Sequence, residues 1–411
     1  MKNSRFIAVA SAALVLLGLT ASTAGANAAP LVSRVSFRDY AACGKAHVGT
    51  ATCLAIRRTK FKNGVQQNAL SPATDQTLGA NALRRAYKIT TVGARFKVIA
   101  IVDAMHSGTV FEDVTAYRKM YALPDITRCG NSGEALTTLP SGKDTCFVQM
   151  DQRGISTQSP KTTDQGWAQE TALDVEMASA VCPKCSILLV EADTPSFKDL
   201  NAAVGVAAGF KGVISISNSY GGPDTPESRF TSYSQATASG IAVVASSGDS
   251  GYGVSAPASF SSVIGVGGTT LNTDSTFRWQ SETAWTSGGS GCSSINPPAA
   301  WQDTNLTNCQ GKSVVDVAAV ADPATGVAVT IDGQWYTFGG TSAAAPIIAA
   351  LFALKNNFGD SAGAYLWANR NSLHDVTLGS NGRCLTRTYC NSSQGYDGPT
   401  GWGTPSGTVA F

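Results

Sequence analysis

The sequence predicts an α/β fold: a mostly parallel sheet with helices on both of its faces. Short runs of apolar, often β-branched residues alternate with segments of helix-forming residues along the middle of the chain. This alternation is typical of parallel strands joined by crossover helices, because parallel sheets are buried on both faces. With 411 residues and 43% hydrophobic content, the chain is long enough for one large core or two.

The individual elements can be placed in chain order. The apolar runs predict strands at residues 97–103, 186–192, 213–217, 242–246 and 262–266. Helices are predicted at residues 167–178 and 197–208, and another immediately before Gly240. A hairpin is predicted through residues 331–338, and it leads into a helix that contains the apolar residues 347–354.

The most informative segment is residues 339–346, Gly-Gly-Thr-Ser-Ala-Ala-Ala-Pro. Small residues on both sides of Ser342 let the backbone turn sharply and let a substrate carbonyl approach. Because a helix starts here, backbone N–H groups point at whatever lies above it. This arrangement suits a nucleophile that must stabilise an oxyanion. An ordinary helix N-cap is the simpler alternative.

The base that could activate Ser342 is more readily found among carboxylates than among histidines. None of the histidines lies in a motif typical of a catalytic base (His47, His106 and His374). Glu170 and Asp174 are four residues apart in a predicted helix, so their carboxylates lie on one face. Two close carboxylates share a proton, and the outer one can orient and tune the inner one. A solvated helix face is the alternative reading of this pair.

A third acidic candidate is Asp249, which lies in Ser-Ser-Gly-Asp-Ser-Gly just after the predicted strand 242–246. It is therefore expected at the carboxyl end of a strand, where open α/β sheets bind ligands. Asp-Ser-Gly is also a common turn sequence, so a structural turn aspartate is the alternative.

Together these segments resemble the sedolisin family of serine-carboxyl peptidases, which have a subtilisin-like fold. Residues 340–346 match the family's serine motif, and its acidic residues match Glu170, Asp174 and Asp249 in the same order. The resemblance covers roughly residues 72–411. It implies Ser342 as nucleophile, Glu170 as general base, and Asp174 as the residue that tunes Glu170. It also implies that protonated Asp249 donates to the oxyanion, so we expect an acid-favouring endopeptidase that acts on peptides or proteins.

The resemblance further implies one structural calcium ion near the carboxyl terminus. The matching residues are Asp375, Val376 through its carbonyl, Ser393, Gly395 and Asp397. Calcium takes oxygen ligands in flexible geometry, which carbonyl-rich loops supply. Ser393 stands where the family often has glycine, and a carbonyl ligand tolerates that change if the backbone angles do. A Gly- and Asp-rich surface turn is the alternative.

Residues 1–28 read as a secretory signal peptide. Lys2 and Arg5 precede the apolar residues 6–19, and Ala26-Asn27-Ala28 forms a typical cleavage site. The apolar stretch is too short for a comfortable transmembrane helix. A secreted protein is therefore predicted.

The ten cysteines fit an oxidising compartment. Each has a close sequence neighbour, which predicts local disulfides at Cys43–Cys53, Cys129–Cys146, Cys182–Cys185, Cys292–Cys309 and Cys384–Cys390. The spacing of Cys182 and Cys185 also occurs in redox and zinc sites, but no second pair or nearby histidine completes a zinc set.

Residues 29–71 are predicted to be a short amino-terminal extension or a vestigial prosegment, and residues 72–411 the peptidase domain. A formal net charge of +2 points to neither a nucleic-acid nor a membrane partner, and a monomer is expected. Two other functions stay open. One is a non-catalytic secreted binding protein that keeps the fold; the other is a subtilisin-like serine peptidase that uses Asp103 and His106.

Overall fold

The computed structural model describes residues 34–67, 77–93, 96–130, 133, 135–140, 145–156 and 160–411. The signal peptide predicted for residues 1–28 lies outside the described residues, as does the domain boundary predicted between residues 71 and 72. No helix within the described ranges is both long and apolar enough to cross a membrane.

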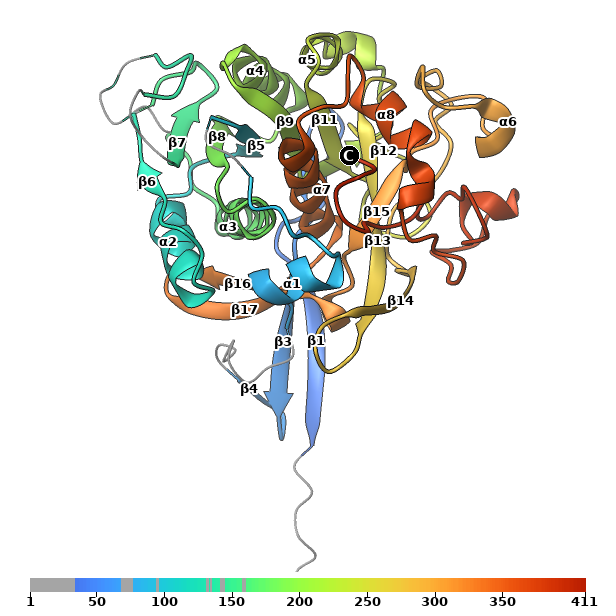
Figure 1. Cartoon of the computed structure of the whole chain (residues 1–411), viewed down its shortest axis with the longest axis horizontal. Helices are drawn as coiled ribbons and strands as arrows, with labels where there is room; N and C mark the ends of the chain where they lie inside the picture. The colour runs from blue at the N-terminus through green and yellow to red at the C-terminus, as the bar shows by residue number, and fades with distance from the viewer. Residues whose placement is uncertain are drawn as a thin grey trace, which may run out of the picture.

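In the described part of the chain, nine strands form one sheet through the body of the protein (Figure 1). They are β5 (Val98–Ala104), β6 (Thr127–Arg128), β7 (Cys146–Asp151), β8 (Ser186–Ala192), β9 (Val213–Asn218), β11 (Ala242–Ser246), β13 (Ile264–Thr273), β14 (Trp279–Ala284) and β15 (Val317–Val320). Their order is β14-β13-β11-β9-β5-β8-β7-β6, with β15 also paired to β13. Within this sheet β13 and β14 pair antiparallel and the other described pairs are parallel. The predicted mostly parallel sheet is therefore confirmed.

One strand differs from its prediction. Residues 262–266 were the expected strand, whereas β13 begins at Ile264 and continues to Thr273. Gly267 and Gly268 interrupt the apolar run, so the sequence pattern stops before the strand does. The extra length is held by main-chain pairing with β14 on one side and β15 on the other.

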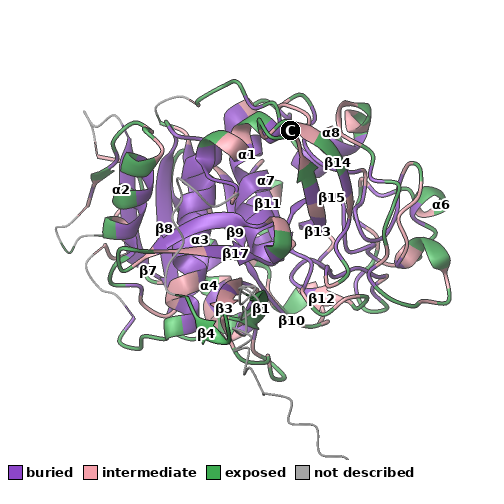
Figure 2. Ribbon diagram, turned by 90° about the horizontal axis from the view of Figure 1, so that it is seen from below, coloured by how far each residue is buried: buried purple, intermediate pink, exposed green. Residues whose placement is uncertain are grey.

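Helices cover both faces of the sheet (Figures 1 and 2). On one face lie α1 (Ala80–Ala86), α2 (Val110–Met120), α3 (Gln165–Val181) and α7 (Thr341–Lys355); on the other lie α4 (Phe197–Gly209) and α5 (Ser232–Ala238). Alternate residues of β5 point to the two faces, as the period of a strand requires. Ile99 and Ile101 pack with α3 and α7, whereas Val98 and Val102 pack with α4 and α5. The predicted helices and their covering of both faces are confirmed.

The amino-terminal extension joins the body through two smaller sheets. Its strands are β1 (Val35–Ala41), β2 (Thr52–Cys53), β3 (Ile56–Lys62) and β4 (Val65–Gln66), and their partners are β10 (Tyr220–Pro223), β12 (Ser255–Ala256), β16 (Val327–Ile331) and β17 (Gln334–Gly339). β1 and β3 form an arm that projects from the body (Figure 1). β3 pairs with β17, and β2 pairs with β10. Because β17 runs directly into α7, the extension reaches the segment that carries Ser342.

The predicted hairpin is confirmed as β16 and β17. Its turn residues Asp332 and Gly333 have φ values of 50° and 71°. Two successive positive φ values match the twist of antiparallel strands, and Asp-Gly is a favoured pair for such a turn.

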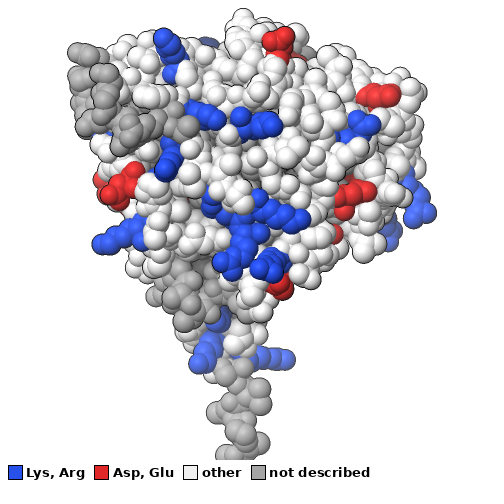
Figure 3. Space-filling model, in the orientation of Figure 1, with Lys and Arg blue, Asp and Glu red and all other residues white. Residues whose placement is uncertain are grey.

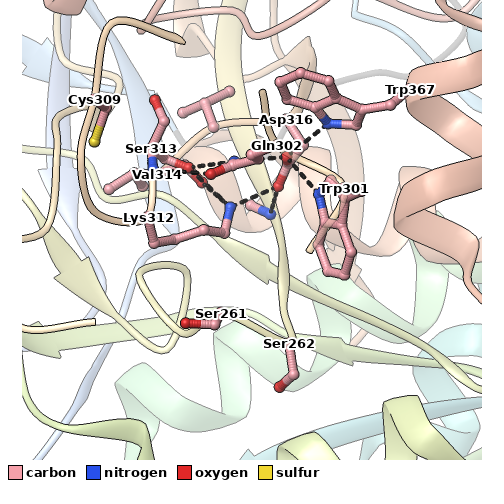
Figure 4. A network of polar contacts seen from close by, with 12 residues as sticks. Ser261, Ser262, Trp301, Gln302, Cys309, Lys312, Ser313, Val314, Asp316 and Trp367 are labelled. Carbon is pink, nitrogen blue, oxygen red and sulfur yellow. Dashed lines mark hydrogen bonds and ion pairs between the residues drawn. The ribbon is translucent and has the colours of Figure 1, made fainter. Parts of the chain in front are cut away.

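A buried ion pair fixes the loops that precede β15 (Figure 4). Lys312 Nζ lies 2.8 Å from Asp316 Oδ2, and both side chains are inaccessible to solvent. The indole N–H groups of Trp301 and Trp367 donate to Asp316 Oδ1, at 3.0 and 2.9 Å, and Gln302 donates to the same oxygen at 2.9 Å. Trp367 belongs to α8 (Ala362–Ala368), so the network ties this loop to the carboxyl-terminal region.

The predicted disulfides are all present, and the described residues contain no free cysteine. Cys43–Cys53 closes a short ring within the amino-terminal extension. Cys53 is in β2, so this disulfide braces the strand that pairs with β10.

Candidate active site

Ser342 lies fully buried in the first turn of α7. Gly340 precedes it with a φ of 96°, a conformation that glycine adopts without strain. Ser342 Oγ donates to the Ser219 carbonyl oxygen at 3.2 Å. Pro346 lacks the N–H that would bond the Ser342 carbonyl, and the Ser219 hydroxyl donates to that carbonyl instead, at 3.4 Å. Ser342 is thus held between α7 and the residue before β10.

A cluster of three buried carboxylates lies next to Ser342. Glu170 and Asp174 come from adjacent turns of α3, and Asp103 comes from the carboxyl end of β5. Burial raises the pKa of Glu170 and of Asp174 well above the usual carboxyl range, and the charge of Asp103 raises both further. Burial also raises the pKa of Asp103 to about 7. The hydroxyl of Ser342 is close enough to Glu170 to lower the pKa of that carboxyl in part.

Asp249 follows β11 and contacts the start of α7. Its Oδ1 accepts hydrogen bonds from the backbone N–H and the hydroxyl of Thr341, each at 2.8 Å. Its Oδ2 is buried without a hydrogen-bond partner among the described residues. Burial raises the pKa of Asp249 to about 7. Below that pH the carboxyl is mostly neutral, and a neutral carboxyl can donate a hydrogen bond through its free oxygen.

A cleft of about 630 Å³ opens beside these residues. Small residues dominate the wall contributed by the body, which comprises residues 221–223, residues 247–255 and Gly289. The opposite wall consists of residues 41, 43–46 and 52–56 of the amino-terminal extension. Basic side chains on the face in Figure 3 gather around α1, which carries Arg84 and Arg85 outside the cleft wall. The cleft is thus lined mostly by uncharged groups.

The amino-terminal extension places a peptide segment directly against the catalytic candidates. β2 pairs antiparallel with β10. The Leu54 N–H is shared between the Ser219 carbonyl, at 3.4 Å, and Glu170 Oε2, at 2.8 Å. The Ala55 N–H also donates to Glu170 Oε2 at 2.8 Å. No local sequence pattern marks this segment, so sequence reasoning missed it.

His106 and His374 contact other parts of the described structure, and His47 bonds to Thr50 through its backbone. His106 Nδ1 is 3.0 Å from Glu191 Oε2, and Glu191 also accepts the Ser107 N–H. His374 stacks on Trp279 with ring centroids 3.9 Å apart. The sequence suggested Asp103 only as a partner of His106, whereas the structure brings Asp103 to Glu170 and Asp174. This arrangement gives no support to a histidine-based site.

Comparison with known proteins agrees with this geometry. A sequence model described as "Subtilase family" matches residues 161–403. The chain belongs to the subtilase family. Within the subtilases, the chain falls in the sedolisin group, because its curated relatives include sedolisins. It is 34% identical to kumamolisin of Bacillus sp. (strain MN-32) over 288 residues, which are 61% of this chain and 52% of that protein. It is 33% identical to sedolisin of Pseudomonas sp. (strain 101) over 205 residues, 42% of this chain and 34% of that one.

The chain therefore spans about half the length of kumamolisin and a smaller share of sedolisin. The solved structure of Pseudomonas sedolisin, a serine-carboxyl proteinase complexed with two molecules of pseudo-iodotyrostatin, superimposes with a TM-score of 0.64. The match covers 81% of this chain and 96% of that one at 22% identity, which supports the subtilisin-like fold.

The residues that we expect to bind calcium lie together in one region of the structure. Asp397 Oδ2 accepts the Ser393 N–H, and Asp375 Oδ2 accepts the Gly395 N–H, both at 2.9 Å. Val376 is buried next to Asp375. Burial raises the pKa of Asp397 to about 7, and the charge of Asp375 raises it further. Two carboxylates therefore converge, although the described residues contain no group of three metal-binding side chains. An ion here would need backbone carbonyl ligands.

Proposed function

We propose that this chain is a secreted serine-carboxyl endopeptidase that hydrolyses peptide bonds with Ser342 as nucleophile. The main support is that the Ser342 hydroxyl lies close to Glu170, and that Glu170 accepts the N–H groups of Leu54 and Ala55, which line the cleft. Family membership and the names of the relatives support the same reaction class. The disulfides agree with the secretion predicted from the sequence.

Endopeptidase action is favoured by the path of the amino-terminal extension along the cleft. Residues 52–56 line the cleft, and the chain continues beyond them in both directions. Thr50 bridges to Ser196 on one side, and β3 pairs with β17 on the other. A cleft that holds the middle of a chain can also hold the middle of a protein substrate.

In the proposed reaction, the buried carboxylate cluster accepts a proton and later returns it. Ser342 Oγ attacks the substrate carbonyl, and Glu170 takes its proton. Glu170 then delivers that proton to the leaving amine, and water later releases the acyl group from Ser342. Asp174 and Asp103 lie close enough to raise the proton affinity of Glu170, which keeps the proton within the cluster. Asp249 in its neutral form would donate to the oxyanion together with the backbone N–H at Ser342.

Activity is expected to fall as the pH rises through about 7, because the pKa of Asp249 is raised to about 7 and its ionised form cannot donate. Cleavage of a mixed peptide library across acidic and neutral pH would measure this dependence. Asp249→Asn provides an amide donor at every pH, so its alkaline limb should move to higher pH. Ser342→Ala, which lacks the proposed nucleophile, is the negative control. If the alkaline limb of the pH profile were unchanged in Asp249→Asn, Asp249 would not be the oxyanion donor. Activity in Ser342→Ala would overturn the assignment of Ser342 as the nucleophile.

One structural calcium ion is proposed at Asp375 and Asp397, with backbone carbonyls of Val376, Ser393 and Gly395 as further ligands. A cation would offset the repulsion between two converging carboxylates, one of them buried. Chelation should lower the melting temperature by about 5 °C, and added calcium should restore it.

Asp397→Asn should remove the calcium-dependent part of this melting temperature. Asp274→Asn, at a turn aspartate outside the proposed calcium site, is the matched control and should keep it. A melting temperature that ignores both chelator and calcium would contradict the proposed site.

A further inference from the structure

We propose that His106 and Glu191 are positioning residues for the reaction: acting through Asp103, they set the acidity at which Glu170 becomes free to accept the proton of Ser342. This inference rests on the proposed peptidase function. It gives a role in the reaction to an ion pair that lies outside the cleft wall.

Asp103 and Glu191 lie side by side on the face of the sheet that α3 covers. They are direct partners in the parallel ladder of β5 and β8, which are neighbouring strands in Figure 1. Side chains alternate along a strand, and Ile101 and Leu189, two residues earlier in each strand, pack in the core beside α3. Asp103 and Glu191 therefore point to that same face, on strands about 4.8 Å apart.

Glu191 is fully buried, and three donors surround its carboxylate. Its Oε1 accepts the Ser107 N–H at 2.8 Å and the side-chain amide of Gln149 at 2.9 Å. Its Oε2 lies 3.0 Å from His106 Nδ1. A carboxylate that meets only donors on these contacts is suited to its ionised form. The hydrogen bond with Glu191 raises the pKa of His106 above its usual value, so in acid the imidazole is a cation that donates to Glu191.

His106 also brings this pair to the surface. Its side chain is 27% exposed, whereas that of Glu191 is inaccessible to solvent. At the other end of the carboxylates, Glu170 is covered by the N–H groups of Leu54 and Ala55. The imidazole is therefore a point at which solvent can change the charge beside the buried cluster.

The neighbouring charges in the described part of the chain do not replace His106. β7 places Asp151 next to Glu191 in the same ladder, but Arg153 Nη2 lies 2.7 Å from Asp151 Oδ2 and balances its charge. Arg128 faces His106 and lowers the pKa of the imidazole only in part. The ion pairs of the described residues give Glu191 no other cationic partner, so His106 is the cation that offsets its charge.

The charge of Glu191 reaches the catalytic base through Asp103. Burial raises the pKa of Asp103 to about 7, and the charge of Glu191 adds to this rise. Burial also raises the pKa of Glu170 well above its usual value, with further contributions from the charges of Asp103 and Asp249. Tyr220 stays neutral, because burial raises its pKa well above the usual range. Glu170 must be ionised to act as a base, and each nearby negative charge opposes that ionisation.

The two members of the pair therefore act in opposite directions. The charge of Glu191 favours retention of protons by the cluster of Asp103, Glu170 and Asp174, whereas the His106 cation favours their release. The first proton to leave the cluster determines the acid limb of the pH profile of kcat/KM. Loss of the Glu191 charge should let that proton leave at lower pH, and loss of the His106 cation should delay its release to higher pH.

The test measures kcat/KM between acidic and neutral pH for one peptide that the wild-type protein cleaves. Glu191→Gln should move the acid limb to lower pH by about 0.5–1 pH unit, and His106→Gln should move it to higher pH by a similar amount. The double variant should lie between the two single variants, because the removed charges have opposite signs. The alkaline limb, which we assign to Asp249, should stay in place in all three.

Matched variants separate this charge effect from a structural one. His106→Arg keeps a cation next to Glu191 and should leave the acid limb close to that of the wild type. Asp360→Asn and Lys184→Gln each remove one exposed charge and should move neither limb, because solvent and salt screen such charges. Melting temperatures at the assay pH would report folding.

The outcomes distinguish this inference from the proposed function. Acid limbs that stay in place, or that move in the same direction, in folded and active Glu191→Gln and His106→Gln would overturn the inference while the peptidase function stands. If Glu191→Gln does not fold, His106→Gln and His106→Arg decide the question, and equal acid limbs in these two variants would overturn it. Absence of peptide cleavage by the folded wild-type protein would overturn the proposed function itself.

Discussion

Glu170→Gln is expected to lower kcat/KM for peptide cleavage by about 10³-fold to 10⁴-fold. Glutamine keeps the shape of the side chain and can still accept a backbone N–H, but it cannot take the proton of Ser342. The protein should stay folded, because the change removes a buried ionisable group whose charged form is disfavoured by burial. Steady-state kinetics at the pH of maximal activity would measure the loss, and the melting temperature would report folding.

Glu176→Gln is the matched control for this prediction. Glu176 is a second fully buried glutamate of α3, and its Oε2 accepts the Thr330 N–H at 3.0 Å, in β16 and away from the cleft. Burial raises its pKa too, so the two variants remove similar buried groups. Comparable losses of activity in both variants would mean that the effect is structural, and a fully active Glu170→Gln would exclude Glu170 as the base.

Lys312→Met is expected to destabilise the protein by about 3–5 kcal/mol. The substitution leaves Asp316 buried without its cationic partner, although the hydrogen bonds from Trp301, Trp367 and Gln302 remain (Figure 4). The cost is that of an uncompensated buried carboxylate rather than of a lost contact. Urea unfolding monitored by tryptophan fluorescence would measure it.

Two further variants separate this explanation from simple loss of packing. Adding Asp316→Asn to Lys312→Met replaces the carboxylate by a neutral amide and should recover part of the lost stability. Lys184→Met, at an exposed lysine, should change the free energy of unfolding by less than about 0.5 kcal/mol. If Lys312→Met behaved like Lys184→Met, the ion pair would contribute nothing to stability.

Much of the central sheet could be predicted because its signals are local. β8 and β11 match their predicted bounds, since short β-branched runs between turn residues leave few alternatives. The i, i+4 spacing of Glu170 and Asp174 puts both on one face of α3 wherever that helix packs. β13 was predicted too short because strand pairing, not an apolar pattern, maintains it beyond Gly267.

The roles assigned to Ser342, Glu170, Asp174 and Asp249 remain predictions, but their positions relative to one another follow from the fold. Asp103 could not be placed from its neighbours in sequence. It joins the cluster only because β5 runs beneath α3 in the tertiary structure, where burial and mutual repulsion raise the carboxyl pKa values together. The sequence alone left Asp103 as a possible partner of His106.

The amino-terminal extension shows both what the sequence determined and what only the tertiary structure decided. By itself the sequence determined the strands, the helices, the nucleophile candidate and the local disulfide of Cys43 with Cys53, because each depends on residues close together in the chain. Only the tertiary structure decided that residues 52–56 form one wall of the cleft, next to Glu170. That placement depends on the pairing of β2 with β10 and of β3 with β17, between segments far apart in sequence. Main-chain pairing carries little side-chain signature, so the sequence holds no local pattern from which this contact could be read.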